Sequence, residues 1–182
     1  MKHRVHSWKF AVPVTAAMVI LSIGMGAGLS LSSLRNDALD IYTEGESGWG
    51  GIQTDYDTIL DSGENLLTVA ERYLDANDTR IRSVELGLEA MRDAQSPSEQ
   101  CTAAQTTRTA VDNLDEQLLT MTLSETDQQF QNELIVDIEA GYRRISQSTY
   151  NETAEAFNRK LQQFPAGIFA DMMGIEPLEL YA

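Results

Sequence analysis

The sequence predicts an all-α protein in which one N-terminal transmembrane helix is followed by an elongated antiparallel bundle of about four helices. Three observations lead to this fold class: a long uncharged apolar stretch near the N-terminus, apolar residues that recur at three-and-four spacing after it, and a scarcity of proline, with 4 prolines in 182 residues. We therefore divide the chain into a cytoplasmic basic segment (1–9), a transmembrane anchor (10–34) and a helical domain (35–182).

The anchor is an uncharged stretch of 25 residues, 10–34, which is enough for a helix to cross a hydrocarbon core of roughly 30 Å. Lys2, Arg4 and Lys9 precede this stretch, and the first acidic residue, Asp37, follows it. Basic residues favour the cytoplasmic side of a membrane. We therefore expect a single-pass protein of the cell (inner) membrane, with a cytoplasmic N-terminus and the C-terminal domain outside.

Small residues and a proline within the same stretch bear on how the anchor is used. Pro13 is expected in the first turn of the helix, where proline costs little. Gly26-Ala27-Gly28 is a loose cleavage site, so a cleaved signal peptide stays open as the alternative, although the apolar region of such a peptide is usually roughly 7–15 residues long. Gly24 and Gly28 form a small-xxx-small pair, which predicts a homodimer through close approach of two helices.

The first two helices of the domain have the least regular sequences. Residues 35–62 have helical spacing, but a cluster of glycines in residues 45–51 surrounds Trp49 and interrupts the pattern. The role of this cluster is left open. A second helix is expected over 64–94, with Asn77 as the one polar member of its apolar seam.

Clearer start signals mark the later helices. Ser96-Pro97-Ser98-Glu99 combines a capping serine, a proline suited to the first helical position and the glutamate of a capping box, and it predicts a third helix over about 97–122. Ser124 followed by Asp127 indicates another cap. A fourth helix is expected to run from there over about 125–164.

The charge of the chain is concentrated in the domain. The formal net charge is -15, and all 28 acidic residues but only 10 of the 13 basic residues follow the anchor, which leaves about -18 on the domain. Such a domain is repelled by nucleic acid and by anionic headgroups, so we expect no nucleic-acid partner. Salt adaptation and ligand binding both stay open as reasons for the acidity.

Few residues in the chain suit catalysis. His3 and His6 are the only histidines and both precede the anchor, while Cys101 is the only cysteine. We therefore expect no enzyme activity, no catalytic residue, no cofactor and no metal site. The carboxylates between Asp55 and Glu64 do not follow the spacing of a calcium-binding EF-hand loop, and we interpret them as a solvated acidic face.

The last helices carry the densest pattern in the chain. Asn151 and Asn158 repeat seven residues apart beside an apolar helical seam. A short apolar helix, 166–173, follows and is expected to end at Gly174 as its cap. We select six residues as a candidate partner-binding surface or core signature: Tyr150, Asn151, Phe157, Asn158, Phe164 and Pro165.

This pattern of Tyr-Asn, Phe-Asn seven residues later, Phe-Pro, Ala170 and Gly174 resembles the C-terminal signature of the LemA family. Trp49 and Ile52 also hold the spacing of that family. Its Asp-Leu-Ile-Pro turn reads Asp61-Ser62-Gly63-Glu64 here, so a looser or displaced turn is expected. The resemblance implies a bacterial cell-envelope protein with a non-enzymatic interaction or scaffold role. Membrane proteases of the HtpX type, or other small membrane proteins, are the partners that it implies.

Two questions stay open at this point, one about the six signature residues and one about the whole protein. They either pack in the core, with the asparagines bonded across the bundle, or form an aromatic and amide patch that docks a partner. A ligand-sensing helical ectodomain is the alternative to the scaffold role for the protein as a whole.

Overall fold

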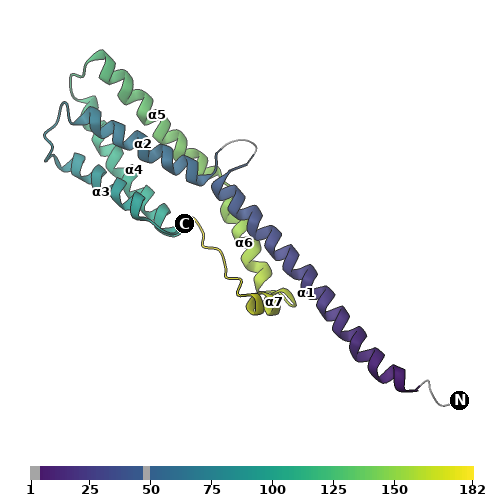
Figure 1. Cartoon of the computed structure of the whole chain (residues 1–182). Helices are drawn as coiled ribbons and strands as arrows, with labels where there is room; N and C mark the ends of the chain where they lie inside the picture. Colours follow the sequence, from purple (N-terminus) through teal and green to yellow (C-terminus); the bar gives the residue numbers. More distant parts are fainter. Residues whose placement is uncertain (1–4, 47–49) are drawn as a thin grey trace. The chain divides into compact units, whose positions relative to one another are not determined.

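The computed structural model describes residues 5–46 and 50–182, and the side chains of these residues except those of 5–11 and 20–21. The fold is all-α with antiparallel helix packing, as the sequence predicts (Figure 1). Trp49 lies outside the described residues. The chain forms two compact units. Unit 1 comprises Met1–Ala38 and Glu152–Leu178, and unit 2 comprises Leu39–Asn151 and Glu179–Ala182.

Unit 2 is built on four antiparallel helices. These are α2 (Ile52–Ala70), α3 (Thr79–Asp93), α4 (Pro97–Leu119) and α5 (Glu125–Gln147). α2 packs mainly against α5, and α3 packs mainly against α4 (Figure 1). Each helix contributes an apolar stripe to one core, because residues three or four apart share a helix face. The largest fully buried members are Tyr56, Ile59, Leu66, Ile81, Leu88, Met91, Leu114, Leu118 and Ile138.

The break between α2 and α3 was placed wrongly by the sequence pattern. The predicted helix over 64–94 is interrupted at 71–78, and Asn77 is exposed in the turn instead of lying on a seam. The Asn77 backbone N–H donates to Asp75 Oδ1 at 2.8 Å, and Asp78 caps α3 by accepting from the Arg80 backbone N–H at 2.9 Å. Such local bonds stabilise a turn in place of a helix. The expected turn at Asp61–Glu64 lies inside α2.

The starts of α4 and α5 confirm the predicted caps, whereas the fourth helix is shorter than expected. Ser96 accepts from the Glu99 N–H at 3.4 Å, and Ser124 accepts from the Asp127 N–H at 3.1 Å. The predicted helix over 125–164 ends at Gln147, and α6 (Tyr150–Leu161) begins after a break at Ser148. The Ser148 hydroxyl accepts from the Tyr150 N–H at 3.2 Å, so it satisfies a donor at the start of the new helix.

Unit 1 is held by a small apolar core. α1 (Val5–Thr43) contributes its residues up to Ala38, and α6 and α7 (Ala166–Met173) contribute the remainder. Gly174 adopts φ 65° and caps α7, as predicted, because glycine tolerates the left-handed conformation. Pro13 lies inside α1 and not in its first turn, because the helix starts at Val5. The buried core residues are Leu31, Phe157 and Ala170, with Leu34, Leu161, Ala166, Ile175 and Leu178 packed against them.

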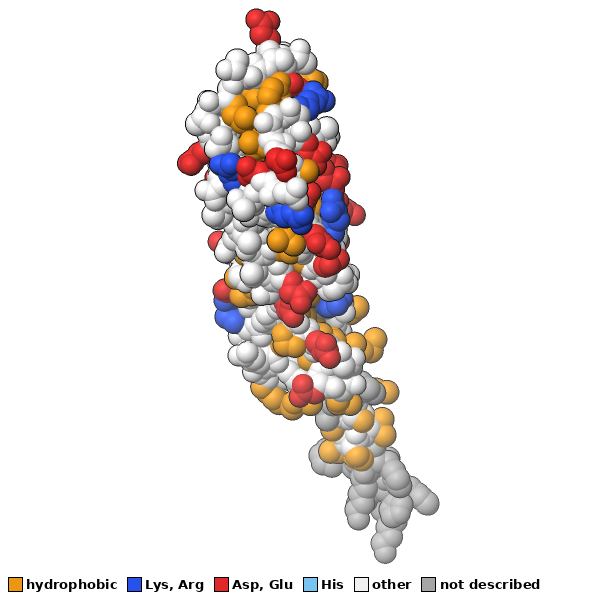
Figure 2. Space-filling model, turned by 90° about the vertical axis from the view of Figure 1, so that its left-hand side faces the viewer, with side chains coloured by type: hydrophobic (Ala, Val, Ile, Leu, Met, Phe, Trp, Pro, Cys, Tyr) orange, Lys and Arg blue, Asp and Glu red, His pale blue; other side chains and the backbone are white. Residues whose placement is uncertain are grey.

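α1 is, within the described part of the chain, the helix that is long and apolar enough to cross a membrane, over Val12–Thr43. A membrane anchor and a signal sequence both satisfy this criterion. In Figure 2, apolar side chains lie toward the N-terminal part of α1 and also in a patch on the bundle, where acidic and basic side chains surround them.

One carboxylate links the start of α5 to the segment that follows α2. Asp127 is buried, and its Oδ2 accepts from the Tyr73 hydroxyl at 2.6 Å and from the Ser124 hydroxyl at 2.9 Å. Arg72 forms an ion pair with its other oxygen. The Tyr73 and Ser124 hydrogen bonds and the Arg72 charge together hold the pKa of the Asp127 carboxyl below its usual value.

The lowered pKa of Asp127 predicts a loss of stability in acid. The folded state favours the carboxylate, so its contribution is present above the unfolded pKa of about 4 and is lost as the pH falls through the lower folded value. We expect the melting temperature of wild type to exceed that of Asp127→Asn at neutral pH, and the difference to shrink below about pH 4. Asp57→Asn, at an exposed position on α2, is the control. A constant difference between wild type and Asp127→Asn at all pH values would contradict this role.

Candidate functional site

The six signature residues are not brought together as one patch. Tyr150 is buried in unit 2, where only 2% of its surface is exposed, and Phe157 is fully buried in unit 1. Phe164 is 86% exposed and is followed by Pro165, which precedes α7. The two asparagines have a different use, because both bind the segment that follows α7. We call this segment, residues 175–182, the tail.

Asn158 binds the tail within unit 1. Its side-chain Nδ2 donates to the carbonyl oxygen of Leu178 at 2.8 Å, and its Oδ1 accepts from the N–H of the same residue at 2.8 Å. A side-chain amide carries both a donor and an acceptor, as a peptide group does. Asn158 therefore satisfies both backbone groups of Leu178, as a neighbouring β-strand would, while the Leu178 side chain packs against the unit 1 core.

Asn151 repeats this arrangement within unit 2. Its Nδ2 donates to the carbonyl oxygen of Tyr181 at 2.8 Å, and its Oδ1 accepts from the Tyr181 N–H at 2.8 Å. The core interpretation of the asparagines expected bonds across the bundle. The acceptors and donors are instead backbone groups of the tail. We refer to the Asn158–Leu178 and Asn151–Tyr181 pairs as the two clamps.

The spacing of the clamps follows from the geometry of a helix and an extended chain. Seven residues of α6 separate the asparagines, which is a rise of about 10.5 Å at 1.5 Å per residue. Three residues separate Leu178 from Tyr181, and an extended chain covers about 9–10 Å in three steps. The earlier asparagine binds the later tail residue, so α6 and the tail run in opposite directions. A heptad repeat on the helix thus matches a three-residue repeat on the tail.

Further contacts hold the end of the tail in unit 2. The Tyr150 hydroxyl donates to the carbonyl oxygen of Glu179 at 2.6 Å, and the Ser98 hydroxyl donates to that of Ala182 at 3.2 Å. The Tyr150 ring lies against Tyr42, with ring centroids 5.0 Å apart. Burial raises the pKa of Tyr150, so its hydroxyl stays protonated and remains a donor at neutral pH.

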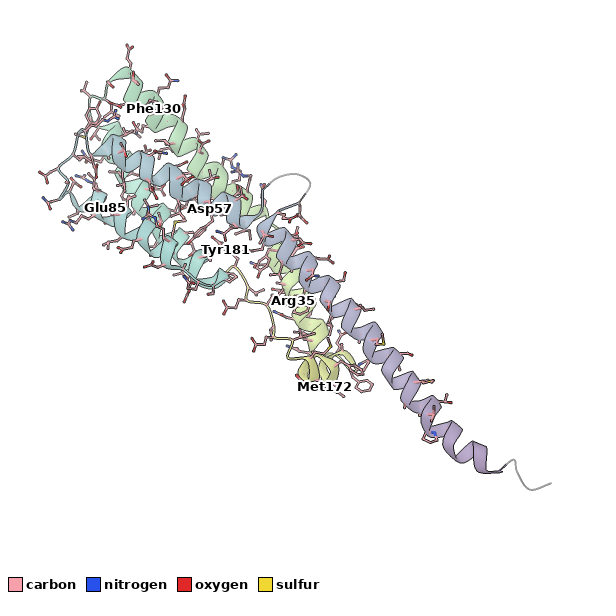
Figure 3. The ribbon with its side chains drawn as sticks, in the orientation of Figure 1. Arg35, Asp57, Glu85, Phe130, Met172 and Tyr181 are labelled. Atoms are coloured by element: carbon pink, nitrogen blue, oxygen red, sulfur yellow. The ribbon has the colours of Figure 1, made fainter. Side chains whose placement is uncertain are left out.

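A cavity of about 290 Å³ adjoins this part of the tail. Its lining includes Cys101, Tyr142, Tyr150 and Tyr181. The Tyr142 hydroxyl donates to the carbonyl oxygen of Ala104 at 2.9 Å. The Tyr181 hydroxyl oxygen, in contrast, is buried and has no hydrogen-bond partner among the described residues. Figure 3 labels Tyr181 beside the bundle.

The cysteine in this cavity is not activated. Cys101 is buried, and burial raises the pKa of its thiol, although a contact from Gln105 at 3.3 Å opposes the shift. The thiolate is the nucleophilic form. Cys101 is therefore held as a thiol at neutral pH, and the cavity offers phenol and thiol groups suited to binding rather than to attack on a substrate.

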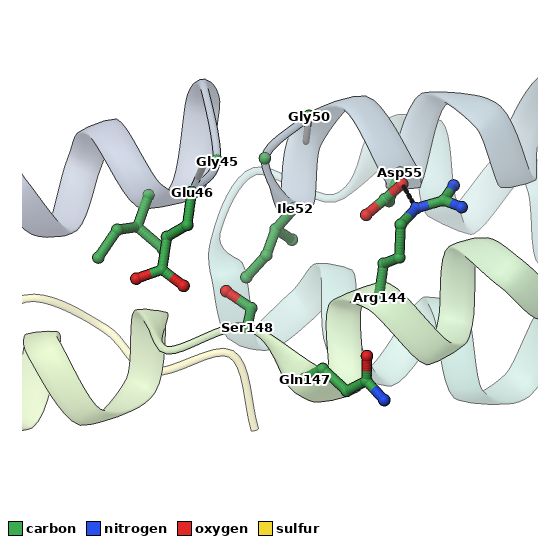
Figure 4. A pocket seen from close by; sticks show the side chains of 10 residues that line it. Gly45, Glu46, Gly50, Ile52, Asp55, Arg144, Gln147 and Ser148 are labelled. Carbon is green, nitrogen blue, oxygen red and sulfur yellow. Dashed lines mark hydrogen bonds and ion pairs between the residues drawn. The ribbon is translucent and has the colours of Figure 1, made fainter. Parts of the chain in front are cut away.

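A second cleft, of about 390 Å³, lies where α1, α2 and α5 meet in unit 2 (Figure 4). Asp55 and Arg144 form an ion pair on its wall, with 2.6 Å between Asp55 Oδ1 and Arg144 Nε. Asp55 was expected on a solvated face, and this prediction is wrong, because the residue is only 4% exposed. Asp57 is exposed as expected. No group of three metal-ligating side chains occurs among the described residues.

The clamps predict that the asparagines stabilise the protein itself. Removing either side-chain amide leaves a backbone N–H and a carbonyl of the tail without their partners, which costs about 1–3 kcal/mol when such groups are buried. We expect Asn151→Ala and Asn158→Ala each to lower the melting temperature of the full chain in detergent, measured by circular dichroism. Asn132→Ala on the exposed face of α5 is the matched control and should change stability by less than about 0.5 kcal/mol.

The opposite result identifies a docking surface. If both variants melt like wild type while a crosslinked complex with another envelope protein is lost, the asparagines bind a partner and not the tail.

A comparison with protein families identifies the chain. The model of the family described as the LemA family matches residues 48–182, a range that holds both clamps and all six signature residues. No curated protein matches the chain.

Proposed function

The chain belongs to the LemA family, and from this premise we propose that it is a membrane-anchored, non-enzymatic interaction protein of the bacterial cell envelope. In this proposal α1 spans the cell membrane with its N-terminus in the cytoplasm. The acidic bundle lies outside and supplies the surface on which partners assemble.

The observation that carries the proposal is the exposed apolar surface of α1. Val12, Val14, Met18 and Val19 are each more than half exposed along a helix long enough to cross a membrane. Such a surface is unfavourable in water and is suited to lipid or to other transmembrane helices. Lys9 and the preceding basic residues, with acidic residues only after the apolar stretch, support the proposed orientation.

The interaction role is supported by how the signature residues are used. The asparagine amides bind the tail and the Tyr150 and Phe157 rings are buried, so these groups stabilise the fold and are not directed at a substrate. The bundle presents a surface of mixed charge with an acidic excess (Figure 2). Envelope proteins with basic surfaces fit this charge, since complementary charge steers association. A protease of the HtpX type remains a partner proposed from the family alone.

A homodimer through Gly24 and Gly28 also remains a proposal. Within unit 1, these glycines face side chains of α7: a Cβ atom added at Gly24 would lie 2.5 Å from the Phe169 ring, and one at Gly28 would lie 3.4 Å from Met173. Dimerisation through the same face would therefore compete with α7 for α1.

Cell fractionation tests the membrane proposal. We expect the protein to remain in the membrane pellet after a carbonate wash, because a spanning helix resists extraction, and we expect protease added to spheroplasts to digest the bundle. Crosslinking in intact cells followed by affinity purification should then recover envelope proteins reproducibly. A soluble protein that begins near Ala27 or Leu29 would contradict the anchor and would establish a cleaved signal sequence.

A ligand-sensing ectodomain is the second candidate function, and the Tyr181 hydroxyl favours it. A buried hydroxyl without a partner is costly, and a ligand in the adjoining cavity could supply that partner.

The effect of the unpaired Tyr181 hydroxyl on stability can be measured directly. In the absence of ligand, Tyr181→Phe should melt at or above the temperature of wild type, because it removes an unsatisfied group. A small molecule that co-purifies with wild type and is lost from Tyr181→Phe, detected by native mass spectrometry, would support sensing. A clear fall in the melting temperature of ligand-free Tyr181→Phe would show that the hydroxyl is already bonded in the protein.

A further inference from the structure

α7, together with the Phe164-Pro165 pair that precedes it, exposes a large apolar surface. Phe164 is 86% exposed, Met172 77%, Met173 58% and Ile168 54%. Met172 projects from α7 in Figure 3. Four large apolar side chains exposed within ten residues form a contiguous patch of the kind that marks an interaction surface.

α7 lies against the uncharged stretch of α1 within unit 1. Phe169 faces Gly24 and Met173 faces Gly28. The contact with Phe169 requires a glycine, because a Cβ at Gly24 would come within 2.5 Å of the Phe169 ring. A groove of about 810 Å³ runs between the two helices, and its lining is apolar except for Ser32. The apolar surface of α7 is thus continuous with that of α1.

A polar contact lies near the C-terminal end of this apolar region. Lys160 Nζ, on α6, lies 3.5 Å from Ser30 Oγ on α1. Gly24 precedes Ser30 by six residues, which corresponds to about 9 Å along the helix at 1.5 Å per residue. Amphipathic helices at a bilayer surface bury their apolar side about 5–10 Å below the boundary between headgroups and acyl chains. Lys160 at that boundary would reach the headgroups with its amine.

We propose that α7 and Phe164 are embedded in the lipid leaflet at the C-terminal end of the α1 span, with Phe164, Ile168 and Met172 in contact with acyl chains. The proposal rests on the proposed function, because it requires α1 to span the membrane. α7 is then a second membrane contact of the chain. At 100° per residue, Asp171 lies on the side of α7 opposite Phe169 and Met173, away from α1, where its carboxylate can turn toward the headgroups.

Lipid fits this surface better than a second copy of the chain does. The patch adjoins the stretch of α1 that the membrane would cover, and the depth set by Lys160 and Ser30 agrees with that of a helix lying at a bilayer surface. The domain carries a formal net charge of about -18, and this charge disfavours the close approach of two copies. The same charge disfavours anionic lipid, so the acyl chains and not the headgroups supply the attraction.

Depth-dependent fluorescence quenching tests this placement. Single cysteines are introduced into the full chain with Cys101→Ser as background: Ile168→Cys and Met172→Cys on α7, Val14→Cys on α1, and Phe130→Cys on α5, an exposed apolar position of the bundle (Figure 3). Each variant is labelled with an environment-sensitive fluorophore and reconstituted in phosphatidylcholine vesicles. The vesicles contain lipids with a quencher either near the headgroup end or near the methyl end of the acyl chain.

The proposal predicts that labels at 168 and 172 lose emission with the quencher near the headgroup end. The label at 14 should lose emission with one of the two quenchers, and the label at 130 with neither. Quenching at 14 without quenching at 168 and 172 would overturn the insertion of α7 and leave the anchor intact. No quenching at 14 would overturn the anchor itself. Emission at 168 and 172 that changes with protein-to-lipid ratio, but not with quencher, would assign the patch to a second copy and overturn the proposal.

Discussion

The path of the tail depends on two asparagine side chains that each imitate a peptide group. Asn151 and Asn158 offer one donor and one acceptor apiece, and each satisfies both backbone groups of a single tail residue. Backbone groups removed from water need such partners. With Tyr181 and Leu178 fixed in this way, one side chain lines the cavity of unit 2 and the other packs on the core of unit 1. The repeated asparagines, which stand out in the sequence, therefore bind the tail of the same chain.

The sequence predicted the presence of the helices better than it predicted the residues at which they begin and end. Helical spacing identified the all-α fold, and the serine caps placed the starts of α4 and α5 correctly. The break at 71–78 was missed because apolar spacing continues through Leu74, while the bonds of Asp75 and Asp78 that form the turn have no periodic signal. Spacing alone also fails to give burial at single positions: Phe130 lies four residues before Leu134 and eight before Ile138 on α5, yet it is 51% exposed.

The partners of the site residues were harder to predict than the residues themselves. The heptad repeat of Asn151 and Asn158 was visible, but the residues after Gly174 form no helix and so carry no periodicity that could pair them with α6. Asp55 looked like its solvated neighbours, because its partner Arg144 lies 89 positions away in the chain. The apolar stretch of α1 and the excess of acidic residues after it can both be recognised from composition alone, and the exposed apolar side chains of α1 agree with the first of these features.

The most direct test of the clamps is amide hydrogen exchange of the tail in the full chain, resolved by residue with NMR. We expect slow exchange at Leu178 and Tyr181, whose N–H groups donate to Asn158 and Asn151, and faster exchange at Glu179 and Leu180 between them, which neither clamp binds. Uniformly fast exchange across the tail, at the rate of an unstructured peptide, would show that the asparagines do not hold the tail and are free to bind another partner.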